Sequence, residues 1–576
     1  MTEFASSDIS ALVARLTLEE KASLCSGSDF WHTQGIDRLG IPAIMLTDGP
    51  HGLRKQAGES DHLGLNDSVP ATCFPSAAGL GSTWDRDLLR RVGEALGAEA
   101  QANDVAVVLG PGINMKRSPL CGRNFEYFAE DPYLAGELAA PMVEGVQSRG
   151  VGTSLKHFAV NNQETDRMRV DAVVDERTLR EIYLPAFEKV VTRAKPWTVM
   201  CSYNRINGTY ASQHRWLLTE LLRDEWGYDG LVVSDWGAVD DRVAGVAAGL
   251  DLEMPSSGGI NDARIVDAVR SGDLAEADLD RAVTRVLELV AKAVAAQSDQ
   301  SFDADADHAL AREVATRTAV LLKNDGGVLP LDAAAAADVV VVGEMARTPR
   351  YQGAGSSQVN PTRLVSALDA LTERGLDLPF APGYRLAGAP QEQPDDELRS
   401  QAVELVRGRT AVLFLGLPGE DESEGYDRRH LDLPESHTAL LRAVAEVADR
   451  VVVLLSNGSS VEVSALERDA DAILELWLGG QAGGSAAVDL LFGEVSPSGR
   501  LAESIPLRLS DSGPAQLPRR AGFGALRRAA EHRLPRARRD GRRGRLPVRA
   551  RPDLHDLRLH RPFGYGRADH GVHGRR

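Results

Sequence analysis

The chain has 576 residues, 43% of them hydrophobic, which is enough to bury two substantial cores and predicts at least two domains. A formal net charge of −18 would repel a phosphate backbone, so we expect no nucleic-acid partner. No apolar run approaches the roughly 18 residues of a membrane span, and charged residues interrupt the first 16 positions, so we expect a cytoplasmic protein without membrane contact.

The first half of the chain alternates short apolar runs with amphipathic segments. Thr17 and Glu20 have the spacing of a capping box, which predicts a helix through Leu24. Six apolar runs predict strands over 43–46, 105–109, 153–158, 197–201, 231–234 and 250–254. Helical patterns cover 85–103, 176–194 and 215–226. We therefore predict an α/β fold in which residues 1–295 form a (β/α) TIM-like barrel.

The second half repeats the alternation with a different set of elements. Residues 296–307 are polar and acidic, which predicts a linker, and a helical pattern follows over 308–322. Strands are predicted over 339–342, 411–415, 451–455 and 472–477, with helices over 397–406 and 437–447. Short parallel-type strands alternating with helices predict an α/β sandwich domain over 308–510.

The segment 511–576 has a different composition from the rest of the chain. It contains 18 arginines, no lysine and six acidic residues, a balance of +12, and its apolar periodicity stops. Composition of this kind is typical of a disordered basic tail.

Asp235 follows the apolar run 231–234 and precedes Trp236-Gly237, at the point where a predicted barrel strand ends. The carboxyl ends of barrel strands carry the catalytic groups of such enzymes. An aspartate at a strand-to-helix turn can equally cap the next helix, predicted here to start near Val239. The sequence leaves both interpretations open.

A second acidic group stands almost 190 residues later, in the predicted second domain. Glu424 belongs to the cluster Glu420-Asp421-Glu422-Ser423-Glu424, which can be a solvated acidic loop. If the loop closes over a cleft, neighbouring carboxylates would raise the proton affinity of one another, as a general acid requires. Two carboxylates from two domains suggest cleavage of a glycosidic bond.

Other polar side chains follow the predicted barrel strands. Asp48 follows the first strand, Lys156 and His157 lie in another, and Tyr203 follows a third. Each alone could be a structural group, and Arg123 could merely pair with Glu126. Together at one barrel edge they suit a ligand rich in hydroxyl groups, and Trp236 would offer a wall for a sugar ring.

Six strings of the chain resemble glycoside hydrolase family 3, in its two-domain β-glucosidase form. They are TDGPHGLR (47–54), GRNFEYFAEDPYL (122–134), KHFAVNNQE (156–164), CSYNRING (201–208), GLVVSDWGA (230–238) and ESEGYDRRHLDLP (422–434). The resemblance covers about residues 10–510.

The resemblance implies a role for each matching residue. Asp235 is the implied nucleophile, which forms a covalent glycosyl-enzyme, and Glu424 is the implied acid/base, so the anomeric configuration is retained. Their carboxyl groups should then lie about 5–5.5 Å apart. The implied contacts to the terminal sugar are Asp48, Arg123, Lys156, His157, Arg167 and Tyr203. No metal ion or cofactor is implied, and the four cysteines lack the CxxC spacing of a zinc or redox site.

The chain departs from the family after the second domain, where relatives have a short PFGHGL-type motif and a fibronectin-type β-sandwich. Residues 548–561 can be encoded by nucleotides that spell this motif in a neighbouring frame, and Pro562-Phe563-Gly564-Tyr565-Gly566 is a weaker in-frame echo of it. We therefore expect a frameshift near residues 512–520 and a disordered tail beyond it.

The leading functional hypothesis is a retaining, exo-acting β-glucosidase that acts on small glycosides or oligosaccharides. A β-xylosidase or another glycosidase of the family is the nearest alternative. The family's β-N-acetylhexosaminidases fit less well, since they have a KHFPGHG-type string and one domain. A sugar-binding protein inactivated by its altered tail is the alternative from a different class. The sequence leaves the aglycone and the formation of a homo-oligomer open.

Overall fold

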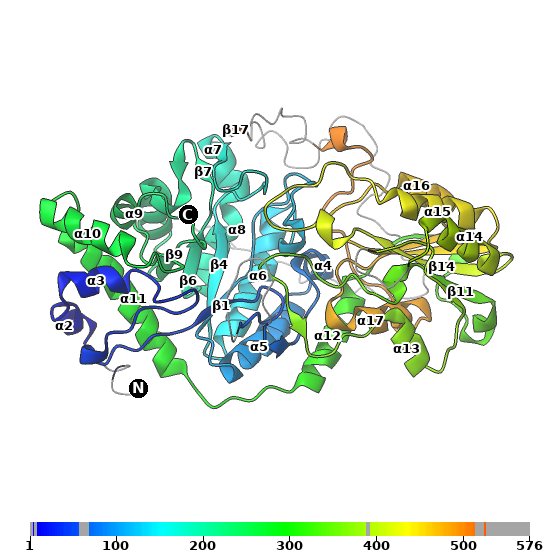
Figure 1. Cartoon of the computed structure of the whole chain (residues 1–576), viewed down its shortest axis with the longest axis horizontal. Helices are drawn as coiled ribbons and strands as arrows, with labels where there is room; N and C mark the ends of the chain where they lie inside the picture. Colours follow the sequence, from blue (N-terminus) through cyan, green and yellow to red (C-terminus); the bar gives the residue numbers. More distant parts are fainter. Residues whose placement is uncertain (1–3, 5–7, 57–67, 387–391, 513–522, 526–576) are drawn as a thin grey trace, which may run out of the picture.

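The computed structural model describes residue 4 and residues 8–56, 68–386, 392–512 and 523–525 of the chain. Within these residues the buried hydrophobic side chains form two clusters. The first surrounds a sheet built from residues before 240, and the second surrounds a separate sheet built from residues after 319. Figure 1 shows the two sheets side by side along the long axis of the molecule.

The first sheet contains five parallel strands in the order β1-β3-β4-β6-β9. All of their residues are buried, as expected for strands covered on both faces. Their bounds are β1 Leu46–Asp48, β3 Val107–Leu109, β4 Gly152–Phe158, β6 Thr198–Cys201 and β9 Leu231–Val233. The five strands confirm the first five strand predictions to within three residues at each end.

The sheet closes into a ring through single bridges instead of full strands. Val233 bridges Leu252, Glu253 bridges Ser26, Gly27 bridges Thr33, and His32 bridges Met45 just before β1. The prediction of a sixth strand over 250–254 is therefore wrong, because this segment supplies isolated bridges only. The segment 26–33 also escaped detection, since two of its bridges are antiparallel and it has no apolar run.

Helices cover the outside of the barrel (Figure 1). The capping box of Thr17 and Glu20 is present at α3. The predicted helix over 85–103 is α5, and that over 215–226 is a π-helical segment, Trp216–Glu225. The helices are α2 Ile9–Val13, α3 Leu18–Leu24, α4 Ala77–Thr83, α5 Arg86–Ala102, α6 Pro132–Gln147, α7 Glu176–Thr178, α8 Pro185–Ala194, α9 Arg242–Ala248, α10 Ile260–Ser271 and α11 Glu276–Ala296.

The connection between the two halves differs from the predicted one. Helix α12 runs from Ala304 to Thr318, and strand β10 follows at Val320–Asn324. The predicted linker is shorter than expected, covering 297–303, and the helix predicted over 308–322 starts and ends four residues earlier. Asp303 caps α12, and two more acids lie in its first turn, where carboxylates stabilise a helix. The acids at the end of the predicted linker therefore belong to a helix N-terminus.

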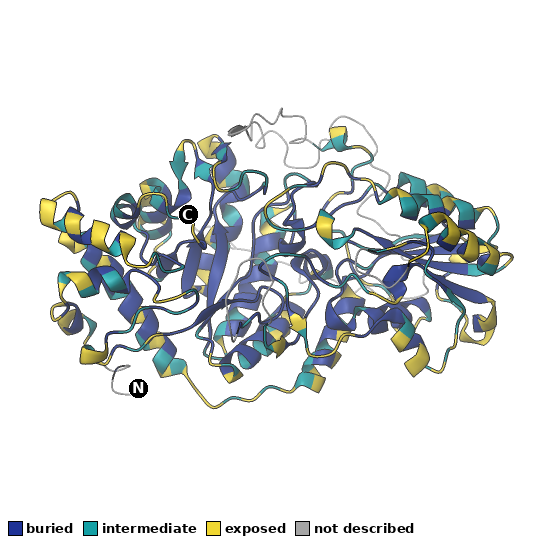
Figure 2. Cartoon of the chain, viewed as in Figure 1, coloured by how far each residue is buried: buried dark blue, intermediate teal, exposed yellow. Residues whose placement is uncertain are grey.

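The second sheet has the order β10-β16-β15-β14-β11-β13. Only β10 is antiparallel to its neighbour. Helices α12, α13 and α17 pack together on one face and α14, α15 and α16 on the other (Figures 1 and 2). The bounds are β11 Val339–Val342, β13 Phe380–Ala381, β14 Thr410–Gly416, β15 Arg450–Ser456, β16 Ala472–Glu475, α13 Ala367–Glu373, α14 Asp395–Val406, α15 Glu435–Ala445, α16 Ser464–Asp469 and α17 Gly483–Leu491. The predicted α/β sandwich is confirmed, with β10 as an added edge strand.

Short pairings join the two halves of the chain. Strand β12, Asn360–Pro361, pairs in parallel with β2, Pro70–Ala71, and α12 packs on α4 of the barrel. Smaller strands β5 Asp171–Val173, β7 Arg205–Ile206 and β8 Thr209–Tyr210 form a further sheet, to which β17 Phe523–Ala525 adds. Apart from β17 and Asp511–Ser512, the predicted tail over 511–576 lies outside the described residues.

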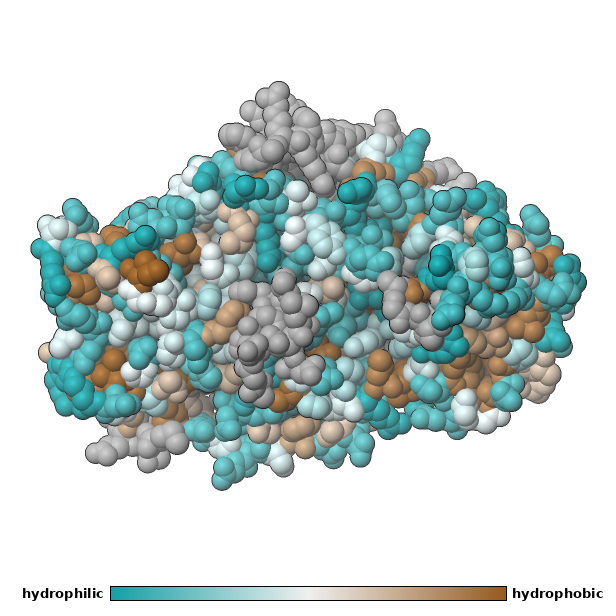
Figure 3. All heavy atoms as spheres, in the orientation of Figure 1, coloured by the Kyte–Doolittle hydropathy of each residue, from teal (hydrophilic) through white to brown (hydrophobic). Residues whose placement is uncertain are grey.

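The surface in Figure 3 is largely hydrophilic, with hydrophobic residues in small scattered groups. Among the described residues, no helix combines the length and the apolar composition that a bilayer crossing requires. All four cysteines are buried and unpaired.

Candidate active site

Eight of the nine site residues predicted from the sequence line one cavity at the carboxyl edge of the barrel sheet. The cavity lining is Asp48, Arg123, Lys156, His157, Met200, Tyr203, Asp235, Trp236, Ser356 and Glu424. Its volume is about 20 Å³, room for about one water molecule. Ser356 and Glu424 come from the second half of the chain, so both halves build the site.

The barrel strands place their polar side chains at a common edge. Asp48 is the last residue of β1, Lys156 and His157 lie near the end of β4, and Asp235 comes two residues after β9. Parallel strands of a barrel end at the same face, so residues distant in sequence converge there.

Asp235 has one carboxylate oxygen engaged and one directed at the site. Its Oδ1 accepts a hydrogen bond of 2.8 Å from the Trp236 amide, whereas Oδ2 has no hydrogen-bond partner in the described part of the chain. Burial raises the pKa of Asp235, against the attraction of Arg123, Arg167 and Lys156. Helix α9 is capped by Asp241 instead. The interpretation of Asp235 as a helix cap is therefore wrong.

His157 lies beside Asp235, with 3.7 Å between its Nε2 and Asp235 Oδ2. Burial and the charges of Arg123 and Lys156 hold the pKa of His157 well below its usual range, so its ring is neutral. The other ring nitrogen lies 3.3 Å from Asn114 Oδ1 and from the Tyr127 hydroxyl. The histidine is thus a fixed, uncharged neighbour of the carboxylate.

Asp48 lies between two cations. Its carboxylate is 3.3 Å from Arg54 Nη1 and 3.8 Å from Lys156 Nζ. Burial nevertheless raises the pKa of Asp48 to about 6, and the nearby carboxylates of Glu424 and Glu126 add to this effect. Arg123 does pair with Glu126, as the alternative interpretation held, yet it also lines the cavity.

Glu424 is held by donors from both halves of the chain. One carboxylate oxygen accepts hydrogen bonds from the Ser356 hydroxyl and, at 2.9 Å, from the Ser356 amide. The other lies 2.8 Å from Arg167 Nη1, and Arg123 Nη2 is 3.8 Å from the carboxylate. Only 11% of the Glu424 side chain is exposed.

These donors correct the prediction that neighbouring acids keep Glu424 protonated. Burial raises the pKa of Glu424, but Arg123, Arg167 and the Ser356 hydroxyl outweigh burial and hold the pKa well below its usual range. Glu422 turns away and accepts hydrogen bonds from the Gly458 amide and the Ser459 hydroxyl. Without a ligand Glu424 is therefore a carboxylate.

Two further predicted residues shape the wall of the site. Arg167, the ninth predicted residue, bonds to Glu424 and stacks over the Tyr203 ring at 4.6 Å. The Trp236 indole donates to the Phe30 carbonyl at 2.9 Å and packs against Trp31. Both side chains are fixed before any ligand enters.

Sequence reasoning missed Ser356, Met200 and Glu164. Ser356 lies in a Gly-Ala-Gly-Ser-Ser segment, whose composition predicts only a loop. Met200 lies inside β6, where it looks like core. Glu164 closes the string KHFAVNNQE, the one signal that could have identified it; it bonds to Arg167 at 2.9 Å.

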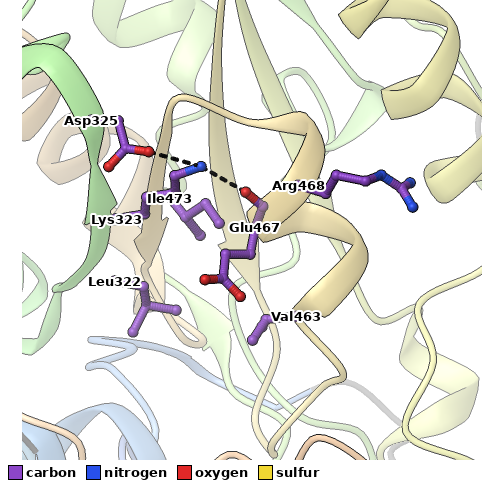
Figure 4. Close-up of a pocket in the computed structure, with 7 residues that line it drawn as sticks. All are labelled: Leu322, Lys323, Asp325, Val463, Glu467, Arg468 and Ile473. Atoms are coloured by element: carbon purple, nitrogen blue, oxygen red, sulfur yellow. Dashed lines mark hydrogen bonds and ion pairs between the residues drawn. The ribbon is translucent and has the colours of Figure 1, made fainter. Parts of the chain in front are cut away.

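A larger cavity of about 310 Å³ lies at the β10 edge of the second sheet, between β10, β16 and α16 (Figure 4). Its lysine, Lys323, already donates to the carbonyls of Glu467 and Ala470 and lies 3.2 Å from Asp325. The remaining lining is Leu322, Val463, Ile473, Glu467 and Arg468, and the Arg468 side chain pairs with Asp469. The smaller cavity at the barrel edge has the convergent polar groups that a ligand site needs.

Two sequence profiles match the chain. The glycosyl hydrolase family 3 N-terminal domain matches residues 17–289, and the C-terminal domain of the same family matches residues 319–534. Among curated proteins, the thermostable beta-glucosidase B of Acetivibrio thermocellus is 55% identical over 508 residues, covering 87% of this chain and 66% of its own length. An exo-alpha-(1->6)-L-arabinopyranosidase of Bifidobacterium longum is 56% identical over 513 residues, covering 87% and 67%.

Solved structures of relatives have the same fold. The GH3 beta-glucosidase of Bifidobacterium adolescentis is 53% identical, with a TM-score of 0.83, covering 89% of this chain and 73% of its own. The beta-glucosidase of Kluyveromyces marxianus in complex with glucose is 29% identical, with a TM-score of 0.84, covering 90% and 81%. The chain spans about two thirds of the length of its curated relatives. The resemblance seen in the sequence is confirmed: this chain belongs to glycoside hydrolase family 3.

Proposed function

We propose that the chain is a retaining, exo-acting β-glucosidase that removes terminal β-D-glucosyl residues from small glycosides. One observation carries the proposal: Asp235, with a free oxygen, and Glu424, from the other half of the chain, line the same cavity. Relatives named beta-glucosidases support the substrate class. Asp48, Arg123, Lys156, His157, Arg167, Tyr203 and Trp236 would hold the terminal sugar.

The proposed reaction has two balanced steps. Asp235 Oδ2 attacks the anomeric carbon, and the bond to the leaving oxygen breaks as Glu424 gives that oxygen its proton. Water then attacks the same carbon, Glu424 takes its proton, and the bond to Asp235 breaks. Two inversions return the sugar with its original configuration.

The ionised state of Glu424 suits the second of these steps. For the first step the carboxyl group must gain a proton, and the substrate provides a cause. Sugar hydroxyl groups that bind Arg123 and Arg167 would draw these cations away from Glu424, which removes the attraction that lowers its pKa. Polar contacts of this kind commonly rearrange between the free and the bound enzyme.

A second candidate activity has specific support. The L-arabinopyranosidase relative is as similar to this chain as the beta-glucosidase relative. An α-L-arabinopyranoside has the ring arrangement of a β-D-galactoside without the hydroxymethyl group, so the same pair of carboxylates could cleave it. A β-xyloside also lacks that group and is the third candidate.

The test is turnover of nitrophenyl β-D-glucoside, β-D-xyloside, α-L-arabinopyranoside and β-N-acetylglucosaminide by the purified chain. We expect the glucoside to give the highest kcat/KM. Asp235→Ala should abolish turnover, and added azide should restore it with an azide product of inverted configuration. Asp241→Ala, which removes the cap of α9 and no residue of the cavity lining, should stay active. Sugar binding without turnover of any glycoside would favour the inactive-protein alternative.

A further inference from the structure

In the loop that carries Glu424, one carboxylate makes three hydrogen bonds to the barrel, beside a backbone bond from the Arg428 amide to the Leu120 carbonyl at 2.8 Å. Asp427 Oδ1 accepts hydrogen bonds from the amides of Gly122, at 3.2 Å, and Glu164, at 2.9 Å. Asp427 Oδ2 accepts a third from the Thr165 amide at 3.2 Å. One side chain of the second half thus binds three backbone amides from two separate barrel loops.

A further hydrogen bond joins the same loop to the barrel, with the barrel side chain as the acceptor. The Gly425 amide donates to Glu164 Oε2 at 2.9 Å, and Glu164 also bonds to Arg167, which in turn holds Glu424. The bonded residues, Gly122, Glu164, Thr165, Gly425 and Asp427, are called the interdomain latch below. Two of them, Gly425 and Asp427, follow Glu424 by one and by three residues along the chain.

The close approach requires glycine on the barrel side. A Cβ on Gly122 would lie 2.0 Å from the Tyr426 carbonyl oxygen and 2.3 Å from that of Ser423. Both distances are far below contact, so a side chain here would push the loop away. Gly122 is thus needed for the loop to reach its position.

The second half contributes side-chain contacts to this loop, from Ser356 to Glu424 and from Gly458 and Ser459 to Glu422, but no strand pairing or long helix. Strand β14 ends at Gly416 and helix α15 starts at Glu435, so Glu424 lies midway in a long connection whose only regular element is a short turn, Gly419–Asp421. Such a connection is held by its contacts and not by backbone pairing.

We propose that Asp427, Glu164 and Gly122 are positioning residues that set the place of Glu424 over the scissile bond by fixing its loop on the barrel. The inference rests on the proposed function, in which Glu424 protonates the leaving oxygen. A mutation far from the reacting atoms that misplaces a catalytic group by about 1 Å can lower the rate about 100-fold. The latch would therefore affect proton transfer more than sugar binding.

The test compares two glucosides that differ in their need for a proton. Cellobiose has a poor leaving group, which needs a proton to depart. The leaving group of 2,4-dinitrophenyl β-glucoside, dinitrophenolate, departs without protonation. Asp427→Ala and Gly122→Ala, one from each side of the latch, should lower kcat/KM for cellobiose about 100-fold. The loss for the dinitrophenyl glucoside should be less than about tenfold, because its leaving group needs no proton.

The controls come from the same loop. Gly419→Ala should match the wild type, since a Cβ there meets nothing within 4 Å. Asp421→Asn should also match it, because Asp421 takes no part in the bonds of the latch. Equal losses of kcat/KM on both substrates in Asp427→Ala and Gly122→Ala, or no loss on either, would contradict the proposed role of the latch.

A separate benchmark distinguishes this failure from that of the proposed function. In Glu424→Ala, the loss of kcat/KM should depend on the leaving group in the same way, with a larger difference between the two substrates. An inactive wild type would overturn the proposed function and the latch with it. A Glu424→Ala variant without this dependence would do the same. If Asp427→Ala does not fold, Asp427→Asn keeps the size of the side chain. Hydrogen exchange at the Gly122, Glu164 and Thr165 amides should be faster in this variant, and unchanged exchange would contradict the latch.

Discussion

The barrel edge and the second-domain loops contribute to the same cavity by different means. On the barrel, Asp48, Lys156 and His157 lie within or at the end of strands, so backbone pairing fixes them. Ser356 and Glu424 lie in loops, and Glu424 is eight residues past the end of β14. The barrel side of the site is therefore preformed by one fold, whereas the position of Glu424 depends on how two folds dock.

The two carboxylates also differ in electrostatics. Both are buried, yet the pKa of Asp235 is raised and that of Glu424 is lowered. The cause is the position of the cations: Arg167 bonds directly to Glu424 at 2.8 Å, while the free oxygen of Asp235 faces a neutral histidine. Burial alone does not decide the charge of a group in this cavity.

The largest effect is expected for Glu424→Gln, which keeps the shape of the loop but removes proton transfer. We expect kcat for cellobiose to fall about 10²- to 10⁴-fold, the usual contribution of a general acid/base. The matched control is Glu420→Gln, an exposed member of the same acidic cluster. Equal losses in both variants would mean that the second domain contributes charge in general and not a single acid.

The next effect tests the contact between the two regions. Lys116 Nζ lies 2.5 Å from Glu503 Oε1, with side chains only 2% and 4% exposed. Lys116→Met leaves a buried carboxylate unpaired, which should lower the free energy of unfolding in urea by about 3–5 kcal/mol. The more exposed pair of Lys189 and Glu137 is the control, and Lys189→Met should cost about 1 kcal/mol or less. A similar cost for both pairs would contradict this ranking.

A smaller effect concerns pH and the barrel side alone. Burial raises the pKa of Asp48 to about 6, so Asp48 becomes protonated as the pH falls below about 6 and loses an acceptor for sugar hydroxyls. We expect kcat/KM to decrease below this pH, approaching tenfold per pH unit, since this ratio reports groups of the free enzyme. In Asp48→Asn the ratio should be low at neutral pH and this decrease should be absent. A decrease that persists in the variant would assign it to another group.

The smallest effects compare one capping box from each region. Thr17 caps α3 of the barrel, and Ser366 caps α13 of the second domain. Thr17→Ala and Ser366→Ala should each lower the free energy of unfolding by about 1 kcal/mol and leave kcat unchanged. A lower kcat in Ser366→Ala alone would show that the docking of the second domain is sensitive to distant changes.

Local patterns predicted the elements that pair regularly. Strand 339–342 was predicted at its observed bounds, and β14 and β15 to within one residue at each end, because continuous apolar runs are typical of buried parallel strands. The ring closure through Leu252, Glu253 and residues 26–33 has no such pattern, since isolated bridges need no apolar run. The start of α12 was missed because acids favour both linkers and helix N-termini.

The sequence by itself determined which residues could act: six strings identify the family, and strand ends place Asp48, Lys156, His157 and Asp235 on one edge. Only the tertiary structure decided their states, because a pKa depends on burial and on charges that come from elsewhere in the chain. Arg167 and Ser356 reach Glu424 from 257 and 68 positions away, and Asp427 holds its loop through amides about 260 to 305 positions away. No local pattern encodes such distances, so the charge and the position of Glu424 follow from the docking of the two domains.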